Sequence, residues 1–146
     1  MFKGSFTFSL DAKGRLNIPA KIRRDINPEA NGAFVFTRGP LQNIDLYPYD
    51  QWKMFESKLK SLNIFDPKQG MVMRRFLETA VEDKIDGQNR VLIPKPLMEF
   101  AGIEKEVFIL GTLNKIELWN PAKYEEYINK EDMAFEDIAQ QVMINN

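Results

Sequence analysis

The stretch "DAKGRLNIP" occupies residues 11–19, and a related stretch, "DGQNRVLIP", occupies residues 86–94. Each copy begins with an aspartate, has an arginine four residues later and ends with an Ile-Pro pair. Alternation of apolar and polar residues before the first copy is typical of a half-buried strand, and glycine within each copy is typical of a tight turn. The repetition predicts two related units built around the same turn.

The similarity between the two halves extends well beyond this turn. "FVFTRG" at residues 34–39 resembles "VFILGT" at 107–112, and "IDLYPYDQW" at 44–52 resembles "IELWNPAKY" at 116–124. The offset between the copies shrinks slightly along the chain, which indicates small loop deletions. We therefore predict a duplicated module of roughly 45 residues, in which a β-hairpin, a short helix and a second β-hairpin follow one another.

The predicted fold class is α+β. The two modules, residues 5–52 and 81–124, are expected to pack about a pseudo-twofold axis as one intertwined domain with peripheral helices. Residues 53–80 are predicted to form a helical connector, and residues 125–146 a C-terminal helix.

Apolar residues at helical spacing locate the longer helices. They are expected at residues 50–62, at residues 71–80, from Pro121 onward and at residues 131–143, with residues 63–70 as a linker. Tyr124, Tyr127 and Ile128 are expected to face inward. For all these apolar stripes, we expect a role in the core or in subunit contacts and not in a ligand site.

The turn itself has a specific backbone requirement. If the flanking segments pair as a hairpin, Asp11 and Arg15 face each other across a three-residue loop, which usually needs a left-handed residue at its last position. Gly14 meets this requirement without steric cost, and Asn89 is the next best residue for it in the second copy. Two different residues thus satisfy one conformation, which supports the alignment of the copies.

Composition excludes several kinds of functional site. The 146 residues are 44% hydrophobic and include neither cysteine nor histidine, which excludes Cys/His zinc sites and the usual histidine bases. Overall the net charge is −1, but the first 24 residues carry six cations against one acid. Residues 117–137 carry seven acids against two cations, so an anion-binding surface near the N-terminus is compatible with an acidic chain. Without a signal-peptide pattern or an apolar run of ~18 residues, we expect a cytoplasmic protein with no membrane partner.

The turn has two readings from chemistry alone. In the first, Asp11 and Arg15 form only a solvent-facing ion pair, which is the more frequent use of such residues. Alternatively, a two-stranded ribbon enters the major groove of DNA and its arginine makes a paired contact to guanine or grips phosphate. The chain has two such turns, residues 11–15 and 86–90, which we call the first and the second tip. Two equivalent tips favour DNA binding, because both can face the same partner.

The paired motif, Asp-x-x-x-Arg followed by an aliphatic residue and Ile-Pro, resembles the MraZ family, within the wider group of SpoVT/AbrB-type swapped-hairpin DNA-binding folds. The resemblance also includes the opening "MFKGSF" and the "IDLY" and "IELW" strands. It implies a bacterial transcriptional regulator, typically a repressor, that binds repeated elements upstream of its own gene in the division and cell-wall gene cluster. For the fold, it implies that the two modules form a swapped-hairpin-like β-barrel. It further implies closed homo-oligomeric rings, of which an octamer is one size, and a location in the cytoplasm at the nucleoid.

Carried onto this chain, the resemblance identifies the motif residues as Asp11 and Arg15 in the first copy and Asp86 and Arg90 in the second. Gly14 and Asn89 shape the turns. The second copy has Gln88 and Asn89 in place of a lysine-glycine pair, so we expect the first tip to contribute more phosphate affinity. The expected DNA-binding residues are Lys13, Arg15, Arg90, Lys3, Lys21, Arg23 and Arg24.

Two other functions remain open from the sequence. A carboxylate enzyme would use Glu82, Asp83 and Asp86 around a metal, but no nucleophile motif or phosphate loop accompanies them. An oligomeric scaffold would bind protein through the same tips without specific DNA binding. We predict no catalytic residues, no cofactor and no metal.

Overall fold

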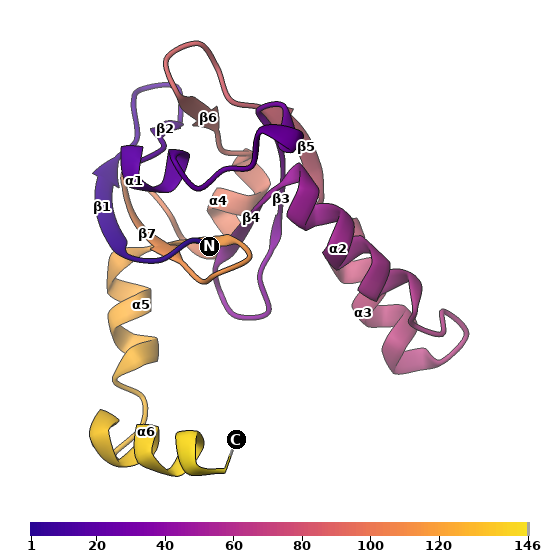
Figure 1. The fold of residues 1–146 in the computed structure, drawn as a ribbon, viewed down its shortest axis with the longest axis vertical. Coiled ribbons are helices and arrows are strands. Elements are labelled where there is room, and N and C mark those ends of the chain that lie inside the picture. The colour runs from indigo at the N-terminus through magenta and orange to yellow at the C-terminus, as the bar shows by residue number, and fades with distance from the viewer. Residues whose placement is uncertain (146) are drawn as a thin grey trace.

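The computed structural model describes residues 1–145 and shows an α+β fold with two antiparallel sheets (Figure 1). The six-stranded sheet has the order β1-β7-β8-β4-β3-β5, and β2 and β6 form a separate two-stranded sheet. The strands are β1 (Ser5–Ser9), β2 (Arg15–Asn17), β3 (Ala33–Arg38), β4 (Ile44–Pro48), β5 (Val81–Lys84), β6 (Arg90–Leu92), β7 (Glu106–Gly111) and β8 (Ile116–Trp119). The helices are α1 (Ala20–Arg23), the 3₁₀ turn η1 (Pro28–Ala30), α2 (Tyr49–Lys60), α3 (Pro67–Leu77), α4 (Lys95–Ala101), α5 (Pro121–Ile128) and α6 (Phe135–Ile144).

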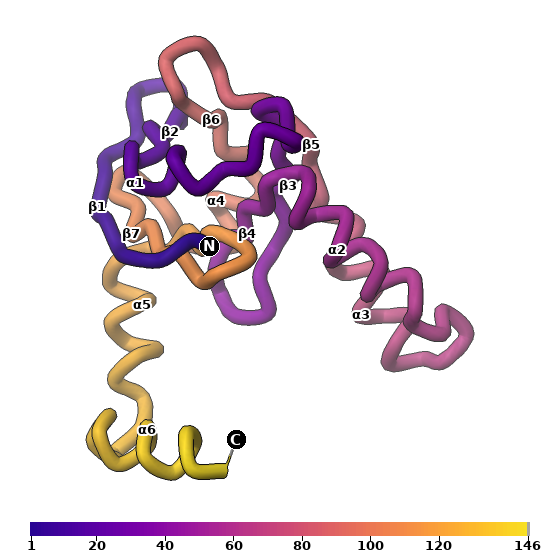
Figure 2. The backbone as a smooth tube through the Cα atoms, in the orientation of Figure 1, coloured from indigo at the N-terminus to yellow at the C-terminus, as the bar shows by residue number. Residues whose placement is uncertain are grey.

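The two halves of the chain exchange strands. β1 pairs with β7 and, in the same way, β5 pairs with β3, while β4 and β8 meet at the centre of the large sheet. The backbone tube follows this crossing from the N-terminal half into the C-terminal half (Figure 2). Neither half therefore completes a sheet alone, and the duplication produces one intertwined body.

The sequence predicted that β1 and β2 pair as a hairpin across the turn. Only the turn itself, closed by the bond from Asp11 N–H to Arg15 O, forms in this way. β2 pairs with β6 instead of continuing a hairpin with β1, and Leu16 lies opposite Val91 in this ladder. Both side chains are buried in the shared core. The exchange is favourable because it places an apolar residue from each half at the centre of the molecule, where a simple hairpin would leave the two halves separate.

The fold class is confirmed, whereas the barrel is not. In residues 1–145 the ladders form an open six-stranded sheet with β1 and β5 at its edges, beside the β2–β6 pair. Closure into a swapped-hairpin barrel therefore stays a prediction, as do the module boundaries at residues 5–52 and 81–124.

One face of the large sheet forms the shared core. Along β4 and β8, Ile44, Leu46, Ile116 and Leu118 point into it, as the two-residue period of a strand requires. The opposite face receives helices: on that side Tyr47 packs with Trp52 of α2, and Trp119 packs with Tyr124 of α5. The sheet thus separates the core and the tips from two helical arms, the first made of α2 and α3 and the second of α5 and α6.

Several helix predictions need correction. α3 begins at Pro67, inside the predicted linker, because the side chain of Asp66 caps it by accepting a hydrogen bond from the Gln69 N–H. Tyr127 and Ile128 of α5 are exposed and do not face the core. α6 begins at Phe135 instead of residue 131, and it is exposed along most of its length. Asn146, at the end of the predicted C-terminal helix, lies outside the described residues.

Candidate nucleic-acid interface

The first tip, residues 11–15, is organised by one aspartate. One oxygen of Asp11, Oδ1, accepts hydrogen bonds from the backbone N–H groups of Lys13 and Arg15, each at 2.9 Å. The other oxygen, Oδ2, accepts from Nε of Arg15 at 2.6 Å. The backbone closes the turn with Gly14 N–H to Asp11 O at 3.0 Å and Asp11 N–H to Arg15 O at 3.0 Å. A single carboxylate therefore fixes both the loop and the arginine.

The second tip, residues 86–90, repeats this arrangement bond for bond. Asp86 Oδ1 accepts from the backbone N–H groups of Gln88 and Arg90 at 2.9 Å, and Oδ2 accepts from Arg90 Nε at 2.9 Å. The turn closes with Asn89 N–H to Asp86 O at 3.0 Å. The two arginines are thus held in the same way at both tips.

The predicted left-handed residues are confirmed. Gly14 has φ of 81° and Asn89 has φ of 62°. A Cβ built on Gly14 would meet only Met98 Sδ, at 3.8 Å, so space does not explain the glycine. The backbone conformation does, since side chains other than those of asparagine and aspartate rarely adopt it.

The strand exchange joins the two tips. Ile18 N–H donates to Asn89 O at 3.0 Å, and Ile93 N–H donates to Gly14 O at 3.1 Å, so each tip is bonded to the strand that follows the other tip. In addition, Nη1 of Arg90 lies 3.9 Å from Asp11 Oδ2. The structure thereby brings the two Asp–Arg pairs into one cluster, which no local pattern in the sequence indicates.

Hydrogen bonding keeps both aspartates ionised. The backbone N–H of Arg15 is the largest influence on Asp11, and together with the Arg15 side chain and the Lys13 N–H it outweighs desolvation and lowers the pKa from 3.8 to about 2. The pKa of Asp86 is also lowered, chiefly by the backbone N–H of Arg90. Both carboxylates therefore hold their arginines at any physiological pH.

The arginines keep donors for a further partner. In residues 1–145, Asp11 engages Arg15 only through Nε, and the structure gives the Nη groups of Arg15 no hydrogen-bond partner. The exposed fraction of the side chain is 29% for Arg15 and 23% for Arg90. A guanidinium oriented at Nε and free at its outer edge is suited to a carboxylate, a phosphate or a guanine.

Comparison with known proteins agrees with this duplicated geometry. The family model described as "MraZ protein, putative antitoxin-like" matches the chain twice, over residues 1–75 and 76–146. The chain belongs to the MraZ family.

Curated relatives cover almost the whole chain. A protein of Thermoanaerobacter sp. (strain X514) named "Transcriptional regulator MraZ" is 40% identical over 140 residues, which are 96% of this chain and 95% of the relative. Proteins of the same name from Acetivibrio thermocellus and Christiangramia forsetii are 37% and 35% identical, over 97% and 98% of this chain and 96% and 93% of their own. Both MraZ repeats of the chain therefore have counterparts in these relatives.

The other predicted cations of this MraZ chain lie in different places. Lys3 precedes β1, whose opposite end leads into the first tip, so the structure does not bring Lys3 to the tips. Lys21 and Arg24 are exposed in and just after α1. Arg23 is half-buried, and its Nε donates to Ile18 O at 3.1 Å, which gives it a structural role in addition to its charge.

Each tip neighbours the helix of the opposite MraZ repeat. Ile18, bonded to the second tip, leads directly into α1, whereas Ile93, bonded to the first tip, leads into α4. The cations of α1 therefore belong to the surroundings of the second tip. The second tip thus lacks a lysine of its own but has α1 beside it, and the expectation that the first tip contributes more phosphate affinity stays a prediction.

Sequence reasoning missed two lysines beside the first tip. Lys95 begins α4 and Lys105 lies before β7, and both line a groove of about 640 Å³ together with Lys13. Lys105 is held there because its carbonyl accepts from the Leu10 N–H at 2.7 Å. Asp83 and Glu104 also line the groove, so its charge is mixed. No signal near residue 13 indicates these lysines, since they arrive through the strand exchange.

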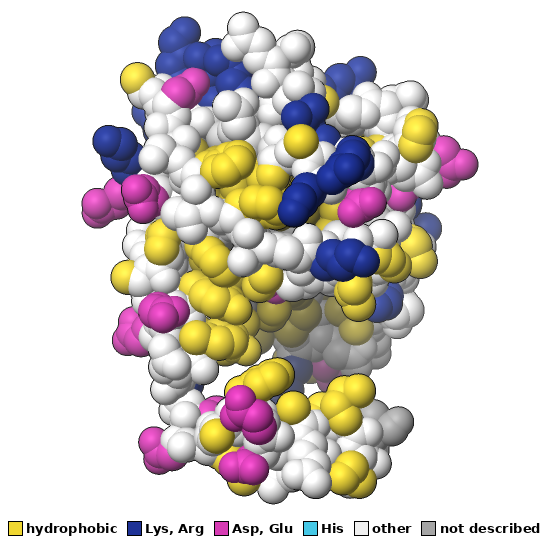
Figure 3. All heavy atoms as spheres, turned by 60° about the vertical axis from the view of Figure 1, so that its left-hand side comes forward, with side chains coloured by type: hydrophobic (Ala, Val, Ile, Leu, Met, Phe, Trp, Pro, Cys, Tyr) yellow, Lys and Arg dark blue, Asp and Glu magenta, His cyan; other side chains and the backbone are white. Residues whose placement is uncertain are grey.

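Charge is unevenly distributed over the surface. Figure 3 shows Lys and Arg side chains mostly in the upper half, where Figure 1 places the tips, and Asp, Glu and hydrophobic side chains together at the lower end, on α6. The acidic segment predicted from the sequence thus lies away from the tips on this face of the molecule. An overall charge of −1 is therefore compatible with a basic end.

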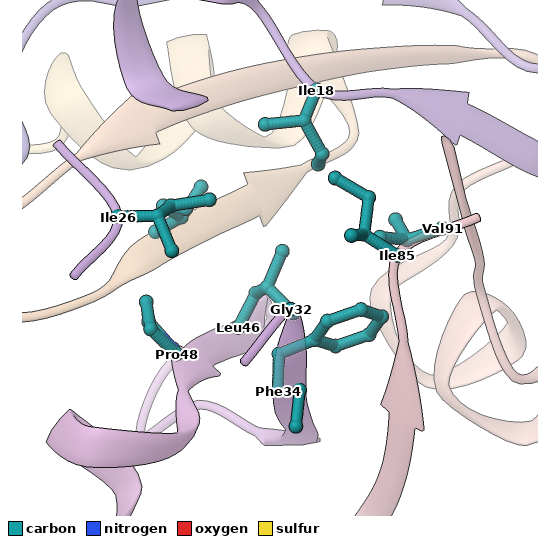
Figure 4. Close-up of a pocket in the computed structure, with 10 residues that line it drawn as sticks. Ile18, Ile26, Gly32, Phe34, Leu46, Pro48, Ile85 and Val91 are labelled. Atoms are coloured by element: carbon teal, nitrogen blue, oxygen red, sulfur yellow. The ribbon is translucent and has the colours of Figure 1, made fainter. Parts of the chain in front are cut away.

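The pocket inside the core is small and apolar. A cavity of about 30 Å³ lies between the two repeats, and Ile18, Phe34, Ile85 and Val91 point into it (Figure 4). Its apolar lining and size suit tight packing and not an organic ligand.

The carboxylates proposed for a metal are not assembled for one. Asp86 is bound to Arg90, and the part of the chain described by the structure contains no group of three or more His, Cys, Asp or Glu side chains suited to a metal.

Another carboxylate, that of Asp45, is buried at the β4–β8 junction and accepts a hydrogen bond from Lys115 Nζ at 2.8 Å. Burial raises the pKa of Asp45 while Lys115 opposes this, as in an internal ion pair.

Among residues 1–145, no helix is long and apolar enough to cross a membrane.

Proposed function

We propose that this protein is a sequence-specific DNA-binding transcriptional regulator that contacts duplex DNA through its two tips. The observation that carries the proposal is the pair of identically anchored arginines, Arg15 and Arg90, brought together by the β2–β6 ladder. The names of the MraZ relatives, which are transcriptional regulators, support it independently.

In the proposed contact, each guanidinium keeps Nε on its aspartate and turns its outer edge to the DNA. Arg15 and Arg90 read guanine or grip phosphate, and Lys13 adds a phosphate contact. Lys95 and Lys105 support the first tip, and Lys21, Arg23 and Arg24 support the second tip. Asp11 and Asp86 are positioning residues, because they act on DNA only through the arginines that they hold.

The proposed regulator acts as a homo-oligomer in the cytoplasm, at the nucleoid. A single copy offers few contacts and should bind weakly, whereas a ring that presents several tips to repeated elements gains affinity through effective concentration. We propose that the elements lie upstream of its own gene in the division and cell-wall gene cluster, and that binding represses that cluster.

The test is a fluorescence-anisotropy titration of a labelled duplex from upstream of this protein's own gene, with a scrambled duplex of the same composition as control. Tighter binding to the upstream duplex, together with a steep loss of affinity as salt is raised, is expected for this proposal. Equal binding to both duplexes would contradict sequence specificity. Absence of binding to either duplex would favour the scaffold function, in which the tips bind protein.

A further inference from the structure

A second groove, of about 560 Å³, lies between the two repeats beside α5. Residues of the β3–β4 hairpin, from the first repeat, line it together with residues of α4, β8 and α5, from the second repeat. We call it the α5 groove. Its volume is in the range of small-molecule sites, and none of its described lining residues belongs to either tip.

Three cations line the α5 groove. Arg38 ends β3, Lys123 lies in α5 and Lys130 follows α5. In residues 1–145, the structure gives none of the three an ion-pair partner. Glu126 also lines the groove, so three cations and one acid leave it a net charge of +2. The groove is therefore suited to an anion.

The guanidinium of Arg38 is held flat against a ring. Its Cζ lies 4.2 Å from the ring centroid of Phe100, and the backbone N–H of Arg38 donates to Thr79 Oγ1 at 3.1 Å. A guanidinium stacked through one face keeps its in-plane N–H donors and its other face for a further partner. Arg38 is thus oriented without being neutralised.

An aromatic ring lies beside the two lysines. Lys123 and Tyr127 are four residues apart and so are neighbours on one face of α5. The N–H of Lys130 donates to Tyr127 O at 3.3 Å, which continues the turn beyond the helix. Tyr127 is stacked on Trp119 with ring centroids 5.4 Å apart, yet it is 45% exposed. The groove therefore combines positive charge with an accessible aromatic ring.

The equivalent place in the other half of the molecule lacks this chemistry. Alignment of the repeats replaces three groove residues: Arg38 by Gly111, Phe100 by Asp25 and Lys123 by Gln51. A Cβ on Gly111 would collide with the backbone of Lys3, so no side chain fits there. Phe55, the counterpart of Tyr127, is packed edge-on against Phe76 of α3. The α5 groove is therefore not a by-product of the duplication.

The combination of charge and rings indicates the class of ligand. An inorganic anion would pair with the cations and leave the ring unused, whereas an apolar ligand would leave the cations unpaired. A nucleoside polyphosphate uses both features. Its phosphate oxygens accept charge-assisted hydrogen bonds from arginine and lysine, and its base stacks on an aromatic ring.

We propose that the α5 groove binds a nucleoside polyphosphate. In this site, Lys123, Lys130 and the free N–H groups of Arg38 bind the phosphates, and the base stacks on the exposed side of Tyr127. The proposal goes beyond DNA binding and does not depend on it, because the groove and the tips consist of different residues.

The first experiment is isothermal titration calorimetry of the full chain without DNA. ATP, GTP, CTP and UTP are titrated separately, each beside its nucleoside and beside inorganic tripolyphosphate. At least one nucleotide should bind once per chain and more tightly than both its nucleoside and tripolyphosphate. Failure of all four nucleotides to bind, or affinity no greater than that of tripolyphosphate, would overturn the proposal.

The second experiment locates the phosphate contacts by removing charge. Lys123→Gln and Lys130→Gln should each weaken binding of the nucleotide about tenfold, as expected for a lost hydrogen bond from a charged group. Lys58→Gln is the matched control, because Lys58 is the exposed counterpart of Lys130 in the first repeat. The control should bind like wild type. Equal weakening in all three variants would show diffuse attraction and contradict a site in the groove.

The third experiment tests the stacked base. Tyr127→Leu should weaken nucleotide binding about tenfold and leave tripolyphosphate binding unchanged. Tyr127→Phe keeps the ring and should bind the nucleotide like wild type. Because Tyr127 also packs on Trp119, thermal unfolding of both variants is measured. Normal nucleotide binding by a folded Tyr127→Leu variant would contradict stacking of the base in this groove.

A single-stranded oligo(dA) of ten nucleotides tests the other source of the same chemistry. For a site that takes free nucleotides, its affinity should not change in Lys123→Gln. If the strand binds more tightly than the nucleotide and loses affinity in this variant, the assignment to a free nucleotide is wrong. All these titrations lack duplex DNA, so their failure leaves the proposed function standing. Loss of duplex binding by tip variants likewise leaves the groove unaffected.

Discussion

The two tips have the same hydrogen bonds and different charges. Asp11 and Asp86 each accept two backbone N–H groups and one arginine Nε, with every distance between 2.6 and 2.9 Å. Lys13, however, corresponds to Gln88. The two tips therefore share the geometry of the arginine, whereas their charge differs.

The residues around the two tips also differ in charge at equivalent positions. Matching hydrogen bonds, Leu10 N–H to Lys105 O and Ile85 N–H to Gly32 O, show that Lys105 corresponds to Gly32. Lys95 similarly corresponds to Ala20. The first tip is therefore surrounded by lysines of the second repeat, and the second tip by the cations of α1. Each tip takes its supporting charge from the opposite half of the chain.

The largest effect is expected from removing an anchored arginine. Arg15→Ala should reduce affinity for the upstream duplex about ten- to a hundredfold, which corresponds to ~1–3 kcal/mol for one paired contact to a base. Arg90→Ala should have a comparable effect, since its anchoring is the same. Anisotropy titrations measure both, with Lys3→Ala as the control at the opposite end of β1. An Arg15 variant that binds like wild type would remove this residue from the interface.

A backbone substitution should come next in size. Gly14→Val forces a β-branched residue to φ of 81° and should lower the free energy of unfolding by about 1–3 kcal/mol. Asn89→Gly, at the corresponding position, should change it by less than about 0.5 kcal/mol, because glycine adopts that conformation freely. Denaturant unfolding of both variants checks the comparison. Equal stability of Gly14→Val and wild type would disprove the turn geometry.

Exchanging the unlike residues should have a smaller effect on binding. Lys13→Gln should lower affinity several-fold for every duplex sequence and reduce the salt slope by about 1 for each engaged tip, as expected for a lost phosphate contact. Gln88→Lys should increase the slope by a similar amount. Titrations at several salt concentrations test both variants. A change in sequence preference, in place of a uniform change, would show that Lys13 reads bases.

The smallest effect concerns pH. Because the pKa of Asp11 in the folded protein is about 2, below its ordinary value of 3.8, its contribution to stability is complete above pH 3.8. That contribution should disappear as the pH falls from 3.8 to about 2. NMR titration of the Asp11 carboxyl measures this directly, and Arg15→Ala should raise its pKa by removing the side-chain hydrogen bond. Titration of wild-type Asp11 at 3.8 or higher would show that the anchoring bonds do not form.

The turns were predictable from sequence, whereas the exchange of strands was not. Gly14, Asn89 and the Asp–Arg spacing report local backbone chemistry, and all were predicted correctly. In contrast, β1 has the same alternating pattern whether it pairs with β2 or with β7, so periodicity does not reveal its partner. For the same reason, Lys95 and Lys105 could not be assigned to the first tip, because tertiary pairing alone brings them there.

The helical arms show a second limit of the sequence. Apolar spacing correctly located α2 and α5, but it does not distinguish an apolar face that is buried in the chain from one that stays exposed. Tyr127 and Ile128 were expected inside for this reason and are exposed. The start of α3 was missed because a capping aspartate, Asp66, outweighs the loop-like composition of residues 63–70.

The central claim, that the tips contact DNA, is tested most directly by cross-linking. The chain has no cysteine, so Ala12→Cys and Gln88→Cys each create a unique thiol at an exposed tip position for a photoreactive label. Ser57→Cys, exposed on α2, is the control. We predict cross-links to the upstream duplex from positions 12 and 88 and none from position 57. Cross-links from position 57 alone, or equally from all three, would contradict the account.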